Sequence, residues 1–327
     1  MASRLIAHTV ASAFAFAFAF AFALAGQGAA WACPTPPPAV RDIDANRYYT
    51  DDRSSIVDPV LKARNEAAVK PVNDYLDVVA RAANRFQVGG GQEDARCALA
   101  WLQAWARQDA LLGRMSSNQS YYTRKWTLGG LALNYARVQA AAPAAQRAAI
   151  EAWFKRLADA TMAHADAGKG IRNNHYYWEG LAVTAVGAVT RDARYTDWGR
   201  KVFEHAMGQI QPDGSLPHEM ARASKALHYH LYAAAPLVMM ASILDRRDPA
   251  LDRLVRFAVD GVADPTPFER MSGVAQERPA RAPGWIAIYE RHADKPLSAA
   301  PPPPNNWDAR MGGDRNLPNP LEHPRAG

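Results

Sequence analysis

Long apolar runs are scarce in this sequence, and the alternating alanines and phenylalanines of residues 13–24 form the main one. This run is too short to favour a membrane span, and no later segment approaches the roughly 20 apolar residues that a spanning helix needs. Arg4 gives the chain a basic start, and Ala30 to Ala32 match an A-x-A cleavage site. The pattern predicts an export signal over residues 1–32 and no membrane partner.

Basic tracts are also missing, although 38 lysines and arginines outnumber 32 acidic residues and give a formal net charge of +6. Without such a tract or a familiar nucleic-acid-binding signature, we expect no nucleic-acid partner. The positive excess favours an acidic partner, and an exported protein meets acidic polysaccharides. Residues 33–327 have the length of one large domain, which we expect to act as a monomer in the periplasm or outside the cell.

Cysteine is limited to Cys33 and Cys97, which excludes a framework of several disulfides. In an oxidising compartment these two residues have one possible intramolecular pairing, so the sequence predicts a disulfide between them. The disulfide would pin the proline-rich residues 34–38 onto the domain. The alternative is a lipid on Cys33, the first mature residue, and the bulky Trp31 before the cleavage point argues against it.

Long alternations of β-branched residues with period two are absent as well, which argues against a β-sheet protein. Apolar residues recur instead at helical spacing. The segments with this pattern are residues 60–86, 93–112, 123–141, 145–165, 174–189, 193–209, 221–244 and 250–262. Helices of this length joined by short loops pair antiparallel. The sequence therefore predicts an all-α protein, either a bundle or a ring of helical hairpins.

Two segments carry side chains that suit a sugar acid. Asn173 to Trp178 read Asn-Asn-His-Tyr-Tyr-Trp at the predicted start of a helix, and offer amide, imidazole, phenol and indole groups. Arg222 and Tyr229 lie seven residues apart in another predicted helix, so they are expected on nearly one face, two turns from each other. An anionic ring could bridge the two segments.

These strings resemble those of the mannuronate-specific alginate lyases, polysaccharide lyase family five, which are exported bacterial enzymes with an incomplete (α/α) toroid. The family typically has Asn-Asn-His-Ser-Tyr-Trp where this chain has residues 173–178. Residues 216–219, Arg222 and residues 226–230 are close to its Leu-Pro-Asn-Glu and Arg followed by Ala-Leu-x-Tyr-His. The resemblance covers nearly the whole mature chain and implies an alginate lyase domain over residues 33–327.

The activity that the resemblance implies is β-elimination, in which C5 of a uronate loses a proton and the glycosidic oxygen leaves C4. Asn174, His175 and Arg222 match family residues that neutralise the carboxylate and stabilise the developing dianion. Tyr229 matches the proton-transfer tyrosine, a base as phenolate and an acid as phenol. An unperturbed tyrosine titrates near about 10, so a phenolate requires cationic neighbours such as Arg222 or a protonated His175. With guluronate, which is inverted at C5, His175 would be the better-placed base.

The resemblance also implies a set of substrate-binding residues. They are Asn46, Arg47, Tyr48, Asn118, Gln119, Trp126 and Trp178. Arg47 stands where the family has lysine. A guanidinium can bind a carboxylate through two parallel hydrogen bonds, whereas an ammonium acts as a point charge. Before Arg124 the family has Gly-Lys-Ser-Met, whereas residues 120–123 read Ser-Tyr-Tyr-Thr and add aromatic rings in a predicted loop over the cleft. These departures bear on substrate choice more than on reaction type.

Other interpretations of the same residues remain open. Asn173 can cap the helix and leave Asn174 free for substrate. His228 and His230 flank Tyr229, but ligands on a helix usually stand at i and i+4, whereas i and i+2 point apart. We therefore expect no metal and no cofactor, with His230 supporting Tyr229 instead.

Other activities remain alternatives too. A glycoside hydrolase needs two carboxyl groups that flank the scissile bond, and Glu179, Asp213 and Glu219 show no persuasive pair. A lyase for another polyuronate, such as glucuronan, needs much the same centre, because that centre recognises a uronate more than its remaining hydroxyls. A non-catalytic protein that binds polyuronate would keep the cleft and leave the polymer intact.

Overall fold

The structure is a computed structural model that describes residues 32–168, 170–279, 281–293, 296–297 and 304–323. The predicted export signal covers residues 1–32. All of it except Ala32 lies outside the described residues, so the signal stays a prediction. Cys33 and Cys97 are both disulfide-bonded, which confirms the predicted disulfide and leaves no thiol for a lipid. Residues 35–327 form one compact unit, which holds the helices and strands.

The described residues are mainly helical, which confirms the predicted all-α class. The α-helices are α1 (Pro59–Gly89), α2 (Gln92–Ala106), α3 (Asn118–Val138), α4 (Ala144–Ala167), α5 (Asn174–Thr190), α6 (Ala193–Gln209), α7 (Pro217–Met220), α8 (Ala226–Leu244), α9 (Pro249–Ala263), α10 (Thr266–Ser272) and α11 (Ile286–Ala293). The 3-10 helices are η1 (Gln139–Ala141), η2 (Ala223–Lys225) and η3 (Ala309–Met311). Strands β1 (Trp307–Asp308) and β2 (Gly313–Asp314) form a short antiparallel pair.

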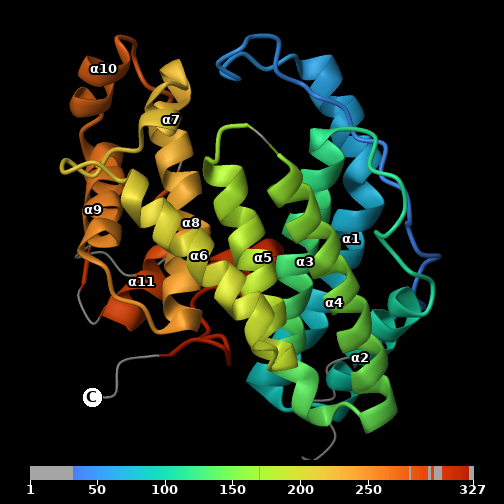
Figure 1. Cartoon of the computed structure of the whole chain (residues 1–327). Helices are drawn as coiled ribbons and strands as arrows, with labels where there is room; N and C mark the ends of the chain where they lie inside the picture. The colour runs from blue at the N-terminus through green and yellow to red at the C-terminus, as the bar shows by residue number, and fades with distance from the viewer. Residues whose placement is uncertain (1–31, 169, 280, 294–295, 298–303, 324–327) are drawn as a thin grey trace, which may run out of the picture. The chain divides into compact units, whose positions relative to one another are not determined.

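The long helices form two layers (Figure 1). In the inner layer α1 packs on α3, α3 on α5, and α5 on α8. Each inner helix also packs against the helix that follows it, which places α2, α4, α6 and α9 in the outer layer. This row of helical hairpins is the incomplete (α/α) toroid that was predicted.

Helix α1 illustrates how the sequence sets a helix boundary. The Asp58 carboxylate accepts hydrogen bonds from the backbone N–H groups of Val60 and Leu61, and Pro59 stands in the first turn, where no N–H donor is needed. Gly90 follows the last turn at φ 68°, a left-handed conformation that glycine adopts without strain. Both ends of α1 are thus encoded locally.

Two predicted helices are shorter in the structure. Helix α2 ends at Ala106 rather than at residue 112. The helix predicted from residue 221 begins at Ala226, because Ala223 adopts a left-handed φ of 51°. The side chain of Gln276 holds this break, since it donates to the Ala223 carbonyl (3.0 Å) and accepts from the Leu227 N–H (3.0 Å).

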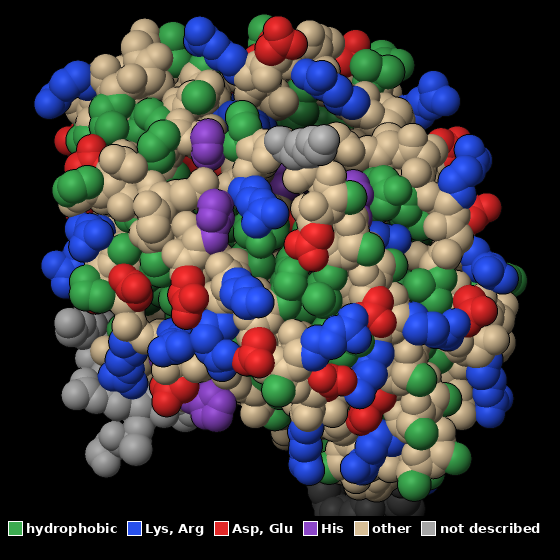
Figure 2. All heavy atoms as spheres, in the orientation of Figure 1, with side chains coloured by type: hydrophobic (Ala, Val, Ile, Leu, Met, Phe, Trp, Pro, Cys, Tyr) green, Lys and Arg blue, Asp and Glu red, His purple; other side chains and the backbone are tan. Residues whose placement is uncertain are grey.

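Helix α8 forms part of the core. Residues Ala223–Leu244 are long and apolar enough to span a membrane by length and composition, which corrects the expectation that no segment after the signal is so apolar. However, 83% of the most apolar window is buried inside the protein, as expected for a core helix. On the face shown in Figure 2, basic and acidic side chains are interspersed rather than gathered in one tract.

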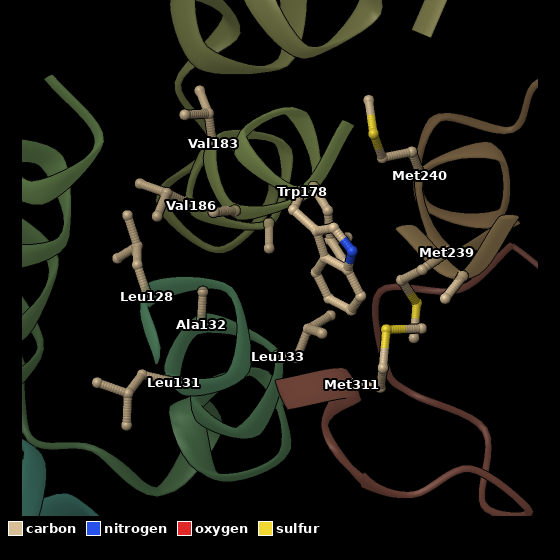
Figure 3. Close-up of a cluster of buried hydrophobic side chains, with 14 of the residues drawn as sticks. Leu128, Leu131, Ala132, Leu133, Trp178, Val183, Val186, Met239, Met240 and Met311 are labelled. Atoms are coloured by element: carbon tan, nitrogen blue, oxygen red, sulfur yellow. The ribbon is translucent and has the colours of Figure 1, made fainter. Parts of the chain in front are cut away.

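The centre of the core lies between α3, α5 and α8 (Figure 3). Side chains labelled there include Leu128, Leu131, Leu133, Trp178, Val183, Val186, Met239, Met240 and Met311. Gly180 allows α5 to approach α6 and α8 closely, since a Cβ atom at this position would lie 2.6 Å from Cγ1 of Val202 and 2.9 Å from Cε of Met240. The tight packing fixes where the helices begin, and the site lies at those beginnings.

Candidate active site

A cavity of about 750 Å³ lies at the N-terminal ends of α3, α5 and α8. His175 stands in the first turn of α5 and Tyr229 in the first turn of α8, and both line this cavity together with Arg222. Helix N-termini present unpaired backbone N–H groups and a positive dipole end, which favours a bound anion. A smaller cavity of about 320 Å³ near α9 and α10 contains none of the predicted site residues.

Arg222 lies directly over Tyr229, with its guanidinium carbon 3.9 Å from the centroid of the phenol ring. The prediction that the two residues share a helix is wrong, because Arg222 precedes η2 and the left-handed turn at Ala223. The turn nevertheless folds the guanidinium back over the ring. A fixed cation therefore stands beside the phenol that was predicted to transfer the proton.

The Tyr229 hydroxyl also forms a 2.8 Å hydrogen bond with the hydroxyl of Tyr49. Burial, and then the neighbouring Tyr229, raise the pKa of Tyr49 well above the usual value for tyrosine. Tyr49 therefore keeps its proton and can donate a hydrogen bond to the Tyr229 oxygen when Tyr229 is ionised. The segment before α1 thus contributes a second partner for the phenol.

His175 is held between α3 and its own helix. Its imidazole stacks on the ring of Tyr122 with centroids 3.6 Å apart and planes 9° apart, and its carbonyl accepts a 2.7 Å hydrogen bond from Nζ of Lys125. Burial, then Lys125 and Arg222, hold the pKa of His175 well below its usual range. His175 is therefore neutral near pH 7, and Arg222 is the cation beside Tyr229.

Lys125 is itself buried, with 1% of its side chain exposed, and forms an ion pair with Glu179 at 3.3 Å. Burial lowers the pKa of Lys125 to about 8, against the opposing effect of Glu179. Neither residue lines the cavity, and Lys125 acts on His175 through the hydrogen bond to its carbonyl and through its charge. The pair acts on the site as a support.

Asn173 and Asn174 were proposed as a helix cap and as a substrate contact, respectively. The Asn173 side chain caps α5 by accepting a hydrogen bond from the His175 N–H at 3.2 Å, as predicted. Asn174 is fully buried, and its side-chain nitrogen donates to both carboxylate oxygens of Glu219 at 3.0 Å. It is therefore not free as predicted, although its carboxamide oxygen has no hydrogen-bond partner among the described residues.

The predicted substrate-binding residues separate into two groups. Those that line the cavity are Arg47, Tyr48, Asn118, Gln119 and Trp126. Asn46 is not in the lining, because its side-chain nitrogen is bonded to the carbonyls of Leu61 (2.9 Å) and Arg47 (3.0 Å). Trp178 is 4% exposed and packs in the core near Leu133 and Met239 (Figure 3), one helical turn beyond His175. The structure thus places Asn46 and Trp178 outside the cavity.

Several lining residues were not among the predicted ones. Tyr49, His228 and Arg310 all line the cavity. Tyr122 lines it too, as expected for a ring over the cleft, but residues 120–123 stand in α3 and not in the predicted loop. Tyr49 directly follows a predicted residue, so its position was a usable signal. Arg310 comes from the C-terminal segment and lies 4.6 Å from the Trp126 ring, an approach that nothing local in the sequence indicates.

His230 does not line the cavity, and its ring hydrogen bonds go to Leu216 and Ala226 rather than to Tyr229, which it was predicted to support. Its Nδ1 bonds to the Ala226 carbonyl (2.8 Å) and its Nε2 accepts from the Leu216 N–H (2.9 Å). It thereby holds the start of α7, which carries Glu219 and leads to Arg222. Among the residues that the structure describes, no group of three or more His, Cys, Asp or Glu side chains is placed to hold a metal ion.

Comparison with known proteins gives the family. The alginate lyase family model matches residues 42–268 of this chain. The chain belongs to the alginate lyase family. It is 42% identical over 299 residues to a polysaccharide lyase of Stenotrophomonas maltophilia, covering 88% of this chain and 90% of that protein. It is 35% identical over 262 residues to an alginate lyase of Azotobacter vinelandii, covering 74% of this chain and 70% of that protein.

Solved structures of family members have the same fold. Alginate lyase A1-III from Sphingomonas species A1 matches with a TM-score of 0.71 and 26% identity, covering 90% of this lyase and 86% of that chain. A histidine-to-alanine variant of A1-III complexed with a tetrasaccharide matches with a TM-score of 0.74 and 26% identity over the same shares. This chain is thus a polysaccharide lyase with an (α/α) toroid.

Proposed function

We propose that this lyase depolymerises mannuronate-rich alginate by β-elimination and leaves 4,5-unsaturated uronate ends. The observation that carries the proposal is the pairing of Arg222 with Tyr229 at 3.9 Å in a cavity that His175 also lines. The tetrasaccharide complex of A1-III, which has the same fold, supports a saccharide as the ligand of this chain. The protein is proposed to act as a monomer.

The reaction has two steps at one residue. Tyr229, as phenolate, takes the C5 proton while Arg222 neutralises the uronate carboxylate, which lowers the energy of the dianion that forms. The C4–O4 bond then breaks, C4 and C5 become doubly bonded, and the Tyr229 hydroxyl returns its proton to O4. In mannuronate the C5 proton and O4 lie on the same side of the ring, so one residue can do both.

The charge of the cavity supports an anionic polymer. Its basic lining residues are Arg47, Lys62, Arg222 and Arg310, and its acidic ones are Asp52 and Glu66. Lys62 and Glu66 form an exposed ion pair at 3.6 Å and offset one another. The remaining cations outnumber the remaining anion, so the cavity attracts uronate carboxylates.

A lyase for another polyuronate, such as glucuronan, is the second candidate. The guanidinium of Arg47 lines the cavity where the family string has lysine. It can bind a carboxylate through two hydrogen bonds, a geometry that a lysine ammonium does not offer. The relative with 42% identity is named for polysaccharides in general rather than for alginate. Both observations concern which uronate is bound rather than the reaction.

The test measures ultraviolet absorbance of the purified mature protein with polymannuronate, polyguluronate and polyglucuronate, with Tyr229→Phe as the matched control. We expect absorbance from the conjugated uronate to rise fastest on polymannuronate and not to rise with the variant. A faster rise on polyglucuronate would establish the second candidate. Saturated reducing ends alone would indicate a hydrolase, and bound but intact polymer a binding protein; either result overturns the proposal.

Export to the periplasm is proposed from the signal pattern at residues 1–32, and the disulfide of Cys33 and Cys97 fits an oxidising compartment. Fractionation of the native host followed by N-terminal sequencing tests it. We expect the protein in the periplasm with Cys33 as its first residue. An uncleaved chain in the cytoplasm contradicts the export, and a cleaved chain in the medium contradicts the compartment.

A further inference from the structure

The ring of His175 lacks the hydrogen bond that usually orients a functional imidazole. In most such sites one ring nitrogen faces the substrate, while a carboxylate or a backbone carbonyl fixes the other. Here Nδ1 of His175 is buried and has no hydrogen-bond partner among the described residues. Some other contact must therefore hold the plane of the ring.

Tyr122 of α3 supplies that contact. Its ring lies parallel to the imidazole, with 3.6 Å between centroids and 9° between planes, and both side chains line the cavity. Nζ of Lys125, one turn further along α3, lies 4.5 Å from the Tyr122 ring and donates to the His175 carbonyl at 2.7 Å. Helix α3 thus holds His175 both by its ring and by its backbone.

We propose that Tyr122 is a positioning residue that fixes the imidazole plane of His175 for the elimination. The inference rests on the proposed lyase function and adds a residue to it. The family string quoted above has serine at this position, and serine has no face on which an imidazole can stack. This chain therefore orients its histidine by a contact that the family pattern does not contain.

The same ring keeps water away from His175. The charged groups that face this histidine are Lys125 on α3 and Arg222 before α8, while Glu179 on α5 neutralises Lys125. The phenols of Tyr122 and Tyr229 and the imidazole of His228 line the same cavity. Burial raises the pKa of Tyr122 to about 12, so this phenol is uncharged at working pH, and its observed contact with His175 is through the ring.

Loss of the ring should thus have two effects on His175. The imidazole becomes free to turn out of plane, which misplaces the group that contacts the substrate. It also becomes hydrated, and hydration favours the imidazolium form, so the pKa of His175 rises toward its usual value. The form of His175 that lines the cavity near pH 7 is the neutral one, so a loss of activity that follows its protonation should move to higher pH.

The test compares Tyr122→Ser, Tyr122→Phe and Tyr121→Ser. Tyr121 makes a similar stack, on His164 at 3.6 Å and 4°, but does not line the cavity, so it is the matched control. We expect kcat of Tyr122→Ser to fall on the order of 10- to 100-fold with KM changed little, as for a displaced reacting group. Tyr122→Phe should restore most of kcat, and Tyr121→Ser should resemble the wild type.

A second readout does not depend on activity. Nuclear magnetic resonance of histidine-labelled protein, with the His175 signal assigned from a His175→Asn variant, follows the titration of the imidazole. We expect His175 to titrate at higher pH in Tyr122→Ser than in the wild type, Tyr122→Phe or Tyr121→Ser. If Tyr122→Ser does not fold, Tyr122→Leu, which fills the space without a planar face, is expected to show the same fall in kcat, while the His175 titration stays near that of the wild type because leucine still keeps water out.

A Tyr122→Ser protein with wild-type kcat and an unshifted His175 titration overturns the inference while the lyase function stands. A fall in kcat that Tyr122→Phe does not restore overturns it too, because the hydroxyl rather than the ring would then matter. If the wild type has no lyase activity, the proposed function fails, and the titration alone decides whether Tyr122 shields the imidazole.

Discussion

The buried pair of Lys125 and Glu179 allows stability and activity to be separated. Replacing Lys125 by Met leaves Glu179, which is 6% exposed, as a buried charge without its ion-pair partner. Breaking a buried pair on one side costs about 3–5 kcal/mol. We therefore expect the free energy of unfolding of Lys125→Met, measured by urea denaturation at pH 7, to fall by that amount.

The double variant Lys125→Met/Glu179→Leu should behave differently. Burial lowers the pKa of Lys125 to about 8, which means that desolvation of the ammonium outweighs its attraction to Glu179. Removing both charges at once removes both desolvation costs, and such replacements are often neutral or stabilising. We expect the free energy of unfolding of the double variant to lie within about 1 kcal/mol of the wild-type value.

Activity should not recover with stability. Lys125 also donates to the His175 carbonyl at 2.7 Å, and the methionine that replaces it has no donor to restore that bond. We expect the absorbance assay to show a reduced kcat in both variants. A single variant as stable as the wild type, or a double variant as unstable as the single one, refutes the assignment of the pair as a buried support.

Two further predictions follow from single hydrogen bonds. Tyr49→Phe removes the hydrogen-bond partner of the Tyr229 hydroxyl. Because a hydrogen bond to a charged group contributes about 1.5–3 kcal/mol, kcat should fall on the order of 10- to 100-fold. An unchanged kcat would exclude Tyr49 from the reaction. Burial lowers the pKa of His230 from 6.5 to about 4. Between these two pH values the unfolded chain binds a proton that the folded chain does not. The free energy of unfolding should therefore fall by up to about 3 kcal/mol as the pH drops from 6.5 to about 4. His230→Gln should have a lower but flatter stability over the same window; equal slopes in the two proteins would contradict the assignment.

The helices were predictable because their determinants are local. Apolar spacing gave the inner and outer helices with ends up to six residues from those observed, and caps such as Asp58 and Gly90 lie beside the elements that they end. The break before α8 was not predictable, because residues 221–244 are rich in good helix formers. Gln276, more than 50 residues later, holds that break through the Ala223 carbonyl, which makes it a tertiary effect.

The site was predictable in its residues but not in their arrangement. The sequence marked His175, Arg222 and Tyr229 correctly as members of one cavity. It did not separate Trp178, which faces the core, from His175 one turn earlier, because α5 is apolar on most sides and its periodicity marks no single face. It also did not show that Glu219 engages Asn174, since that contact joins two segments 45 residues apart.

The architecture explains why residues so distant in sequence meet. Helices α3, α5 and α8 lie side by side in the inner layer, and each contributes its first turns to one cavity. Tyr122, His175 and Tyr229 stand in those first turns, where a side chain is fixed by its own helix at one end and open to the cavity at the other. A substitution near the start of one inner helix therefore acts directly on a neighbour from the next. The stack of Tyr122 on His175 is such a case, because a change on α3 alters a residue of α5 without any change in α5 itself.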